Sequence, residues 1–307
     1  MILVTGPNGN VGTELVAQLA GQSALAFRVA AHSPEKIAAK YGDAAPHVRF
    51  DFNDRSTWGA ALDGVTVLFL LFPLPHPRTA KQWMVPFVAA AAAAGVRHIV
   101  YLSVPGADTT KAVPHHAVEK AIRASGVPFT ILRASFFSQN MCRDITTHAV
   151  DVAKHDEIYV PAGRGRTSFI DSRDVAEAAI RIMADPAPHA GRAYLLSGPE
   201  VLDYFEVAEI FGQELGRPIR YANPSLIGFW RRVGPRVTWD TLLFMTIVYS
   251  LTRFGRNAPM SDDLPRLLGR PARTMRDFVA DHKARFTGAD AARSVKVATP
   301  GISKAIA

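Results

Sequence analysis

Three glycines near the N-terminus have the spacing of a phosphate-binding loop. The short apolar segment 2–5 runs directly into Gly6, Gly9 and Gly12, and a helical pattern begins behind them. In such a loop the first glycine permits a tight turn, the second lets a backbone N–H approach a pyrophosphate, and the third lets the helix pack closely on the sheet. The amides at the helix N-terminus then face the phosphates, where the helix dipole favours negative charge. The strand before and the helix behind therefore predict a dinucleotide site.

Residues at the end of the second predicted strand bear on which dinucleotide binds. An NAD site usually has a carboxylate about 20 residues beyond the glycines, where it binds the ribose 2′-OH. Here His32 and Ser33 follow the strand, and Lys36 lies in the helical turn behind them. Glu35 also lies in that turn, where the helix dipole accounts for it. Because His32, Ser33 and Lys36 offer donors to a 2′-phosphate, the sequence favours NADP(H) over NAD(H).

The first half of the chain alternates strand-like and helix-like segments. Gly95 and Gly126 follow two of the predicted helices, in the position after the last turn that favours glycine. This alternation predicts an α/β fold with a Rossmann-type doubly wound parallel sheet and helices on both faces. The predicted strands are 2–5, 27–31, 48–51, 66–72, 98–103 and 129–133, and the predicted helices are 10–20, 34–40, 57–62, 80–94 and 114–125.

Beyond residue 133 the pattern changes. A turn-rich loop at 161–166 precedes a predicted helix at 175–184, with Asp174 as its N-cap. A further strand is expected at 194–197, and from Tyr204 the chain is mostly helical. The expected organisation is a Rossmann NAD(P)-binding domain of residues 1–155 and 165–200, a small, mostly helical substrate-binding domain of residues 156–164 and 201–287, and a loosely ordered tail of residues 288–307.

The composition is that of an ordinary globular enzyme. Of 307 residues, 48% are apolar and 20% are charged. The single cysteine, Cys142, excludes an intrachain disulfide and a cysteine zinc site, and the histidines lack metal-ligand spacing. No basic segment precedes the first apolar run, and the longest apolar stretch, 241–251, is too short to span a bilayer. These features predict a cytoplasmic protein without a metal or a membrane segment.

The formal charge of +8 raises the question of an acidic partner. Much of the excess lies in 217–256, where the arginines are scattered and no nucleic-acid motif accompanies them. A solvated face is the favoured interpretation, with an acidic ligand or partner as the alternative, and we expect no nucleic acid to bind. The arginines of this segment are Arg217, Arg220, Arg231, Arg232, Arg236, Arg253 and Arg256, and its acidic residue is Asp240.

Four segments, 4–12, 118–140, 169–176 and 268–274, resemble the NmrA-like branch of the atypical short-chain dehydrogenases. The most specific is S-G-V-P-F-T-I-L-R, ending at Arg133, with F-F-S-Q-N following it. The resemblance extends from residue 1 to about residue 286. It implies a Rossmann domain that binds NADP(H) or NAD(H), with a small C-terminal domain closing a substrate cleft.

The resemblance also implies roles for individual residues. Many NADP-binding relatives have arginine at the position of His32. Ser103, at the end of the fifth strand, would border the nicotinamide. By position, Asn8, Asn10 and Val11 would supply amides to the pyrophosphate, Asp51 and Phe52 would frame the adenine, Leu71, Phe72 and Pro73 would line the nicotinamide ribose, and Ala134, Phe136 and Phe137 would border the nicotinamide.

The usual acid pair of short-chain dehydrogenases, Tyr-x-x-x-Lys, is missing from this chain. Many relatives have a lysine four residues before the glutamate that matches Glu119, and here that position is His115. Either His115 or His116 could donate a proton, or both could be surface residues at the start of a helix. Ser103 could bind substrate or nicotinamide, or satisfy local backbone groups.

Aromatic residues between 229 and 254 have partly helical spacing. They would form a core or a dimer surface, or wall a pocket for a flat or hydrophobic acceptor. The candidate substrate residues are His116, Asn140, Phe244 and Tyr249.

The leading functional hypothesis is an NADPH-dependent reductase that transfers hydride to a small conjugated acceptor such as a quinone or enone. A small hydrophobic or aromatic substrate and a monomer or homodimer are expected. The alternative is a non-catalytic NAD(P)-binding redox sensor that regulates a protein partner. A reductase or isomerase for a dedicated metabolite is a third possibility, whereas the absence of Gly-x-Ser-x-Gly excludes a typical α/β-hydrolase.

Overall fold

A computed structural model describes residues 1–21, 25–73, 76–143 and 146–287. The chain forms two compact units. The N-terminal unit contains Met1–Ser135, Ser172–Ser197 and Met260–Ala272, and the C-terminal unit contains Phe136–Asp171, Gly198–Pro259 and Arg273–Ala307. This division differs from the expected domain boundaries, because 136–155 pack within the C-terminal unit, where Met141, Ala149 and Val152 join its hydrophobic core. The predicted tail lies outside the described residues.

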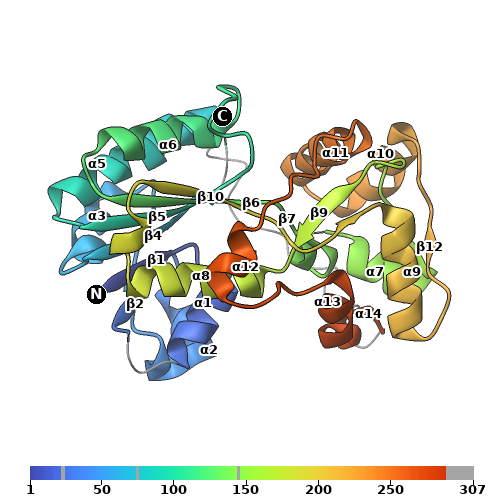
Figure 1. The fold of residues 1–307 in the computed structure, drawn as a ribbon, viewed down its shortest axis with the longest axis horizontal. Coiled ribbons are helices and arrows are strands. Elements are labelled where there is room, and N and C mark those ends of the chain that lie inside the picture. The colour runs from blue at the N-terminus through green and yellow to red at the C-terminus, as the bar shows by residue number, and fades with distance from the viewer. Residues whose placement is uncertain (22–24, 74–75, 144–145, 288–307) are drawn as a thin grey trace. The chain divides into compact units, whose positions relative to one another are not determined.

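A parallel sheet forms the centre of the N-terminal unit (Figure 1). Its seven strands lie in the order β10-β6-β5-β4-β1-β2-β3. Strands β1, β2 and β3 are added toward one edge, and the chain then returns to place β4 on the other side of β1 and adds the later strands toward the opposite edge. This is the predicted Rossmann-type fold, which is confirmed. The strands are β1 (Ile2–Thr5), β2 (Phe27–Ala31), β3 (His47–Arg49), β4 (Val67–Leu71), β5 (His98–Ser103), β6 (Phe129–Ala134) and β10 (Arg192–Leu196).

Helices cover both faces of this sheet. Figure 1 shows α3, α5 and α6 on one face and α1, α2 and α8 on the other. Leu68, Leu70 and Tyr101 point from β4 and β5 into a hydrophobic core shared with the first group of helices. The helices of this unit are α1 (Asn10–Ala20), α2 (Pro34–Tyr41), α3 (Trp58–Leu62), α4 (Pro77–Thr79), α5 (Val85–Ala93), α6 (Pro114–Ala124), α8 (Ser172–Ala184) and α12 (Asp263–Leu268).

Two helices differ from their prediction, one in its regularity and one in its first residue. The helix expected at 80–94 is divided, with a wider π-type turn at Ala80–Met84 before α5. Pro86 lacks the N–H that would bond to the carbonyl one turn earlier, so the regular helical ladder is interrupted there. The helix expected at 175–184 begins at Ser172, so Asp174 lies inside its first turn. The prediction of Asp174 as an N-cap was therefore wrong.

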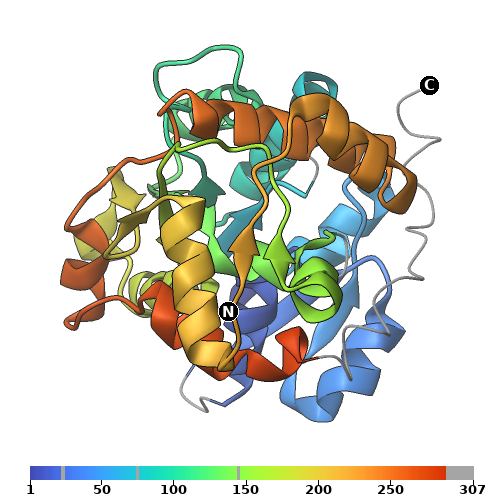
Figure 2. The same ribbon diagram turned by 90° about the vertical axis from the view of Figure 1, so that its right-hand side faces the viewer.

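The C-terminal unit is built on a small sheet of β11 (Val201–Leu202), β9 (Thr167–Ile170) and β7 (Phe136–Phe137). Figures 1 and 2 show α9 (Tyr204–Leu215) and α11 (Trp239–Arg253) beside it. Aromatic rings fill its core, with Tyr204 lying 5.9 Å from Tyr249 between ring centroids. The remaining elements are α7 (His148–His155), β8 (Glu157–Ile158), β12 (Arg220–Tyr221), α10 (Leu226–Val233), α13 (Met275–Asp281) and α14 (Lys283–Phe286). Among the described helices, none is both long and apolar enough to cross a membrane.

Candidate functional site

The glycine loop between β1 and α1 has the tight geometry that its sequence predicts. Gly6 has a φ of +66°, and a Cβ there would lie 2.7 Å from Leu71 Cδ2. A Cβ on Gly12 would lie 2.0 Å from the Gly6 carbonyl oxygen, so α1 packs against the loop backbone without room for a side chain. A Cβ on Gly9 would make ordinary contacts, the nearest 3.4 Å from Gly6 O. Packing within the protein therefore explains Gly6 and Gly12 and leaves Gly9 for close approach of a ligand.

The N-terminus of α1 is suited to phosphate. The helix begins at Asn10 behind Gly9, and its first turn, fully described in the structure, has neither a capping side chain nor an acidic residue. The positive end of the helix dipole is thus not offset by a carboxylate of its own first turn. Asn8 is exposed, Asn10 is half-buried and Val11 is buried. This loop fits the pyrophosphate of a dinucleotide.

Residues at the ends of β2 and β3 meet at one edge of the sheet. His32 Nε2 lies 3.6 Å from Asp51 Oδ2, and His32 Nδ1 lies 3.5 Å from the Ser33 hydroxyl. The His32 side chain is 77% exposed, and Lys36 is exposed on α2. Asp51 also accepts a hydrogen bond of 2.8 Å from the backbone N–H of Asn53. The edge therefore offers the side chains of a histidine, a serine and a lysine, together with a carboxylate, to a ribose.

Aromatic candidates around the cofactor site are largely buried. Phe52 packs edge-on against Phe50 and Phe87 in the hydrophobic core, with ring centroids 4.7 and 5.3 Å away. Phe72 is buried beside His115, with centroids 5.2 Å apart, whereas Pro73 is exposed. The Leu71 side chain borders Gly6, as noted above, so it helps to fix the shape of the glycine loop.

Ser103 belongs to a buried charged network. Its hydroxyl donates to Glu119 Oε1 at 2.7 Å. Arg133 Nε and Nη2 donate to the same carboxylate at 3.0 and 2.7 Å, and Arg133 Nη1 lies 3.1 Å from Asp108 Oδ2. The hydrogen bond from Glu119 is the largest cause of the raised pKa of Arg133. The network fixes the ends of β5 and β6 and α6 relative to one another.

His115 lies on α6 beside this network. Its Nδ1 is 2.8 Å from the Tyr101 hydroxyl, and the side chain is buried. Burial lowers the pKa of His115 to about 4, and the charge of Glu119 opposes this shift only in part. His115 is therefore neutral at pH 7. Burial, with a smaller contribution from Glu119, raises the pKa of Tyr101 well above its ordinary value.

His116 points elsewhere on the same helix. Its Nδ1 is 2.8 Å from the carbonyl oxygen of Ala107. It lines a pocket of about 510 Å³, together with Asp108, Lys120 and Arg123. The two adjacent histidines therefore have different environments, one buried and one at a pocket.

The remaining candidates have diverse surroundings. Ala134 is buried at the end of β6 in the N-terminal unit. In the C-terminal unit, Phe136 and Phe137 form β7, and the Asn140 carbonyl accepts a hydrogen bond from the Thr146 hydroxyl at 3.0 Å. Tyr249 is 2% exposed, and its hydroxyl lies 2.7 Å from His148 Nε2.

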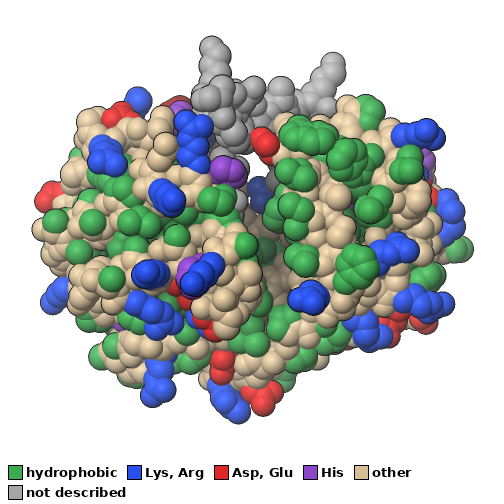
Figure 3. All heavy atoms as spheres, turned by 90° about the horizontal axis from the view of Figure 1, so that it is seen from above, with side chains coloured by type: hydrophobic (Ala, Val, Ile, Leu, Met, Phe, Trp, Pro, Cys, Tyr) green, Lys and Arg blue, Asp and Glu red, His purple; other side chains and the backbone are tan. Residues whose placement is uncertain are grey.

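Phe244, by contrast, is 60% exposed on α11. It belongs to an apolar surface on α10 and α11, visible as the hydrophobic side chains gathered on the C-terminal unit in Figure 3. The exposed members of this surface are Leu226, Ile227, Trp230, Trp239, Leu243, Phe244, Ile247, Leu251 and Phe254.

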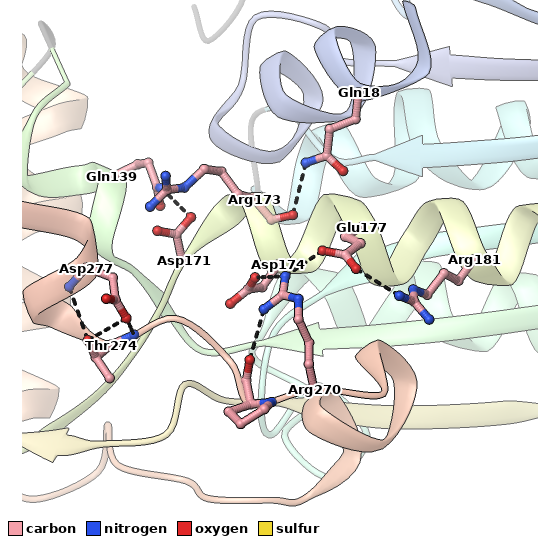
Figure 4. Close-up of polar contacts among 11 residues, drawn as sticks. Gln18, Gln139, Asp171, Arg173, Asp174, Glu177, Arg181, Arg270, Thr274 and Asp277 are labelled. Atoms are coloured by element: carbon pink, nitrogen blue, oxygen red, sulfur yellow. Dashed lines mark hydrogen bonds and ion pairs between the residues drawn. The ribbon is translucent and has the colours of Figure 1, made fainter. Parts of the chain in front are cut away.

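The acidic residues around the start of α8 have structural partners (Figure 4). Asp171 accepts a hydrogen bond of 2.7 Å from Gln139 Nε2 within the C-terminal unit. Asp174, inside the N-terminal unit, accepts one of 2.7 Å from Arg270 Nη2, which also contacts Glu177. No cluster of metal-ligating side chains occurs among the residues that the structure describes.

Sequence reasoning did not include Tyr101, Asp108, Glu119 or Arg133 among the site residues. A signal was present, because Tyr101 and Ser103 are two apart on a strand, and His115 and Glu119 are four apart on a helix. Such spacings put each pair on one face of its element.

Comparisons with known proteins find relatives that match nearly the whole chain. The chain is 30% identical over 294 residues to an NAD(P)H azoreductase of Xenophilus azovorans, covering 94% of this chain and all of the relative. It is 31% identical over 293 residues to a (4-alkanoyl-5-oxo-2,5-dihydrofuran-3-yl)methyl phosphate reductase of Streptomyces griseus, covering 93% and 99%.

Among solved structures, an NADPH-dependent quinone oxidoreductase of Escherichia coli, complexed with NADPH, superposes with a TM-score of 0.78. That protein is 26% identical, and the match covers 92% of this chain and 99% of the other. The profile of the NmrA-like family matches residues 1–236. The chain therefore belongs to the NmrA-like family.

Proposed function

We propose that the protein is an NADPH-dependent reductase that transfers hydride to a small conjugated acceptor such as a quinone or an enone. The glycine loop is the observation that carries this proposal, because α1 packs on the loop backbone through Gly12 and its first turn contains no carboxylate that would compete with a bound phosphate. When bound there, the nicotinamide supplies the hydride. The protein contributes binding, orientation and exclusion of water.

The acceptor class is supported by the names of the relatives. One relative is an azoreductase, and one structural relative is a quinone oxidoreductase. The substrate named for the Streptomyces griseus relative is a 5-oxo-2,5-dihydrofuran, a ring whose carbon–carbon double bond is conjugated with a carbonyl group. All three names describe electron-poor conjugated systems, which accept hydride readily.

The proton that completes the reduction comes from solvent in this proposal. His115 has a pKa of about 4, so its cationic form accounts for on the order of 0.1% of the molecules at pH 7. A reduced quinone is a weakly basic oxyanion that water protonates without a strong acid at the site. We therefore assign His115 a positioning role, holding Tyr101 and the Phe72 ring beside the strand ends.

NADPH preference is part of the proposal. His32, Ser33 and Lys36 would donate to the 2′-phosphate, and Asp51, which lies beside His32, is the opposing carboxylate. The adenine contact of Asp51 and the nicotinamide contacts of Ala134, Phe136 and Phe137 also remain proposals. The same holds for substrate contacts by His116, Asn140, Phe244 and Tyr249.

The test is a titration with NADPH and NADH, followed by a panel of quinones and enones while absorbance of the reduced cofactor is recorded. We expect tight NADPH binding and acceptor-dependent loss of absorbance. Binding without oxidation against every acceptor would instead favour the redox sensor, which predicts a protein partner whose affinity changes with the cofactor. Absence of binding would contradict the proposed role of the glycine loop.

A further inference from the structure

The arginine-rich segment 217–256 separates into two groups in the structure. Four of its arginines form ion pairs with acids from α7 to β8. Arg232 Nη2 and Arg236 Nη1 lie 3.0 and 2.9 Å from Asp151 Oδ1. The other pairs are Arg217 with Asp156, and Arg220 and Arg232 with Glu157. These arginines therefore stabilise the C-terminal unit, and their charge is largely offset locally.

Arg253 is different. It is the last residue of α11, it is exposed, and within the described part of the chain it forms no ion pair. Its guanidinium lies close to the loop 161–166, since a Cβ on Gly163 would be 3.6 Å from Arg253 Cζ. A cation suits the C-terminus of a helix, which accounts for one positive charge at this place. The helix dipole does not account for Arg164 and Arg166, the two arginines of the loop that line a pocket together with Arg253.

Those arginines reach Arg253 because the loop packs directly on the helix end. A Cβ on Gly165 would lie 1.9 Å from the carbonyl oxygen of Thr252, so only glycine permits this contact. Arg164 and Arg166 flank Gly165, and with Arg253 and Gly255 they line a pocket of about 450 Å³. Three guanidinium groups are thus gathered around one open pocket.

The charge of this pocket is only partly offset. Arg166 Nη2 lies 3.0 Å from Glu206 Oε2, and the Arg164 guanidinium stacks on the Phe205 ring at 4.7 Å. Among the described residues, Glu206 is the only carboxylate that forms an ion pair with any of these arginines, and it pairs with Arg166 alone. The group therefore has an excess of two positive charges, which corresponds to the charge of one phosphate dianion.

We propose that this pocket binds the phosphoryl group of a small anionic ligand. Guanidinium groups donate planar pairs of N–H bonds that match phosphate oxygens, and such charge-assisted bonds are among the strongest in proteins. The stacked Arg164 has its plane held by Phe205, which lowers the entropic cost of ordering it. The site lies wholly within the C-terminal unit and does not depend on the reductase activity.

The test uses inorganic phosphate as the probe, by calorimetric titration at constant ionic strength. The double variant Arg164→Gln/Arg253→Gln should bind phosphate at least about tenfold more weakly than the unaltered protein. Arg231→Gln is the matched control, because this exposed arginine lies on α10 outside the pocket. It should change phosphate affinity by less than about twofold.

Three further measurements keep the result interpretable. NADPH affinity of the double variant should equal that of the unaltered protein, since phosphate bound at the glycine loop would not depend on these arginines. Arg253→Lys, which keeps a cation at the helix end but loses the planar fork, should weaken phosphate binding to an intermediate degree. Acetate should bind more weakly than phosphate.

Three outcomes would overturn the proposal. The first is unchanged phosphate binding in the double variant, and the second is an equal loss in Arg231→Gln, which would indicate nonspecific attraction to a cationic surface. Acetate binding as tight as that of phosphate would likewise refute selectivity for a phosphoryl group.

Discussion

Replacement of Gly12 by alanine should damage both the fold and the cofactor site. The added Cβ would lie 2.0 Å from Gly6 O and 2.8 Å from Gly6 C, both backbone atoms that cannot rotate away. Ordinary contact begins at 3.4 Å, so α1 or the loop must shift by about 3.4 − 2.0 = 1.4 Å. Overpacking of this kind costs about 1–3 kcal/mol of unfolding free energy. Misplacement by about 1 Å also costs on the order of 100-fold in functions that depend on geometry.

The assay combines thermal unfolding with NADPH titration by tryptophan fluorescence. We expect Gly12→Ala to lower Tm by several degrees and to weaken NADPH binding by about 100-fold, equivalent to about 2.7 kcal/mol. Two neighbouring glycines provide matched controls. At Gly9 the nearest contact of a Cβ would be 3.4 Å, so alanine there should leave Tm unchanged and weaken only cofactor binding.

Gly21, at the other end of α1, has a right-handed φ of −81°, and a Cβ there would be 3.6 Å from the Gln18 carbonyl oxygen. Alanine at this position should therefore leave both Tm and NADPH affinity unchanged. Equal NADPH affinity of Gly12→Ala and Gly21→Ala, or equal unfolding temperatures of the two variants, would refute a steric clash at Gly12.

Other perturbations probe the charged groups. Glu119→Gln should lower the unfolding free energy by about 3 kcal/mol in urea titrations, because Arg133 loses its buried carboxylate partner; a loss below about 0.5 kcal/mol would contradict the buried pair. His115 and two other buried histidines have pKa values lowered from 6.5 to about 4. Between pH 4 and pH 6.5 the unfolded chain therefore binds more protons than the folded protein does. Stability should then fall as the pH drops from 6.5 to 4, by up to about 1.4 kcal/mol per pH unit for each histidine. His115→Gln should reduce that slope in denaturant titrations across this range, and an unchanged slope would refute the burial argument. Asp51→Asn should increase the ratio of NADPH to NADH affinity by about two- to fivefold, since it removes a screened carboxylate beside His32; equal titration curves for both proteins would count against a 2′-phosphate at this edge.

The parallel sheet could be predicted because each of its signals is local. The strand at 98–103 and the helix at 10–20 have the predicted bounds, since apolar runs and flanking glycines define them within a few residues. Errors arose where one residue changed the local geometry, as at Pro86. The helix containing Asp174 begins at Ser172, three residues earlier than expected.

The charged network could not be predicted in the same way. Arg133 meets Glu119 and Asp108 only because β5 and β6 run parallel in register, with Ser103 paired to Arg133. The partners of the arginine-rich segment likewise come from a distant part of the chain, at 151–157. Sequence spacing reveals which side chains share one helix or strand, whereas ion pairs between elements depend on the packing of the whole unit.

The discontinuity of the N-terminal unit has a consequence for biosynthesis. The unit is completed by α8 and β10, and then by α12, whose Asp263 accepts a hydrogen bond of 2.9 Å from the Leu195 backbone N–H. Arg270, the partner of the buried Asp174, is translated almost a hundred residues after it. A nascent chain that stops before Met260 therefore exposes surfaces that the finished protein covers. The N-terminal unit therefore reaches its full stability only after residues up to Ala272 have been synthesised, long after its first strands.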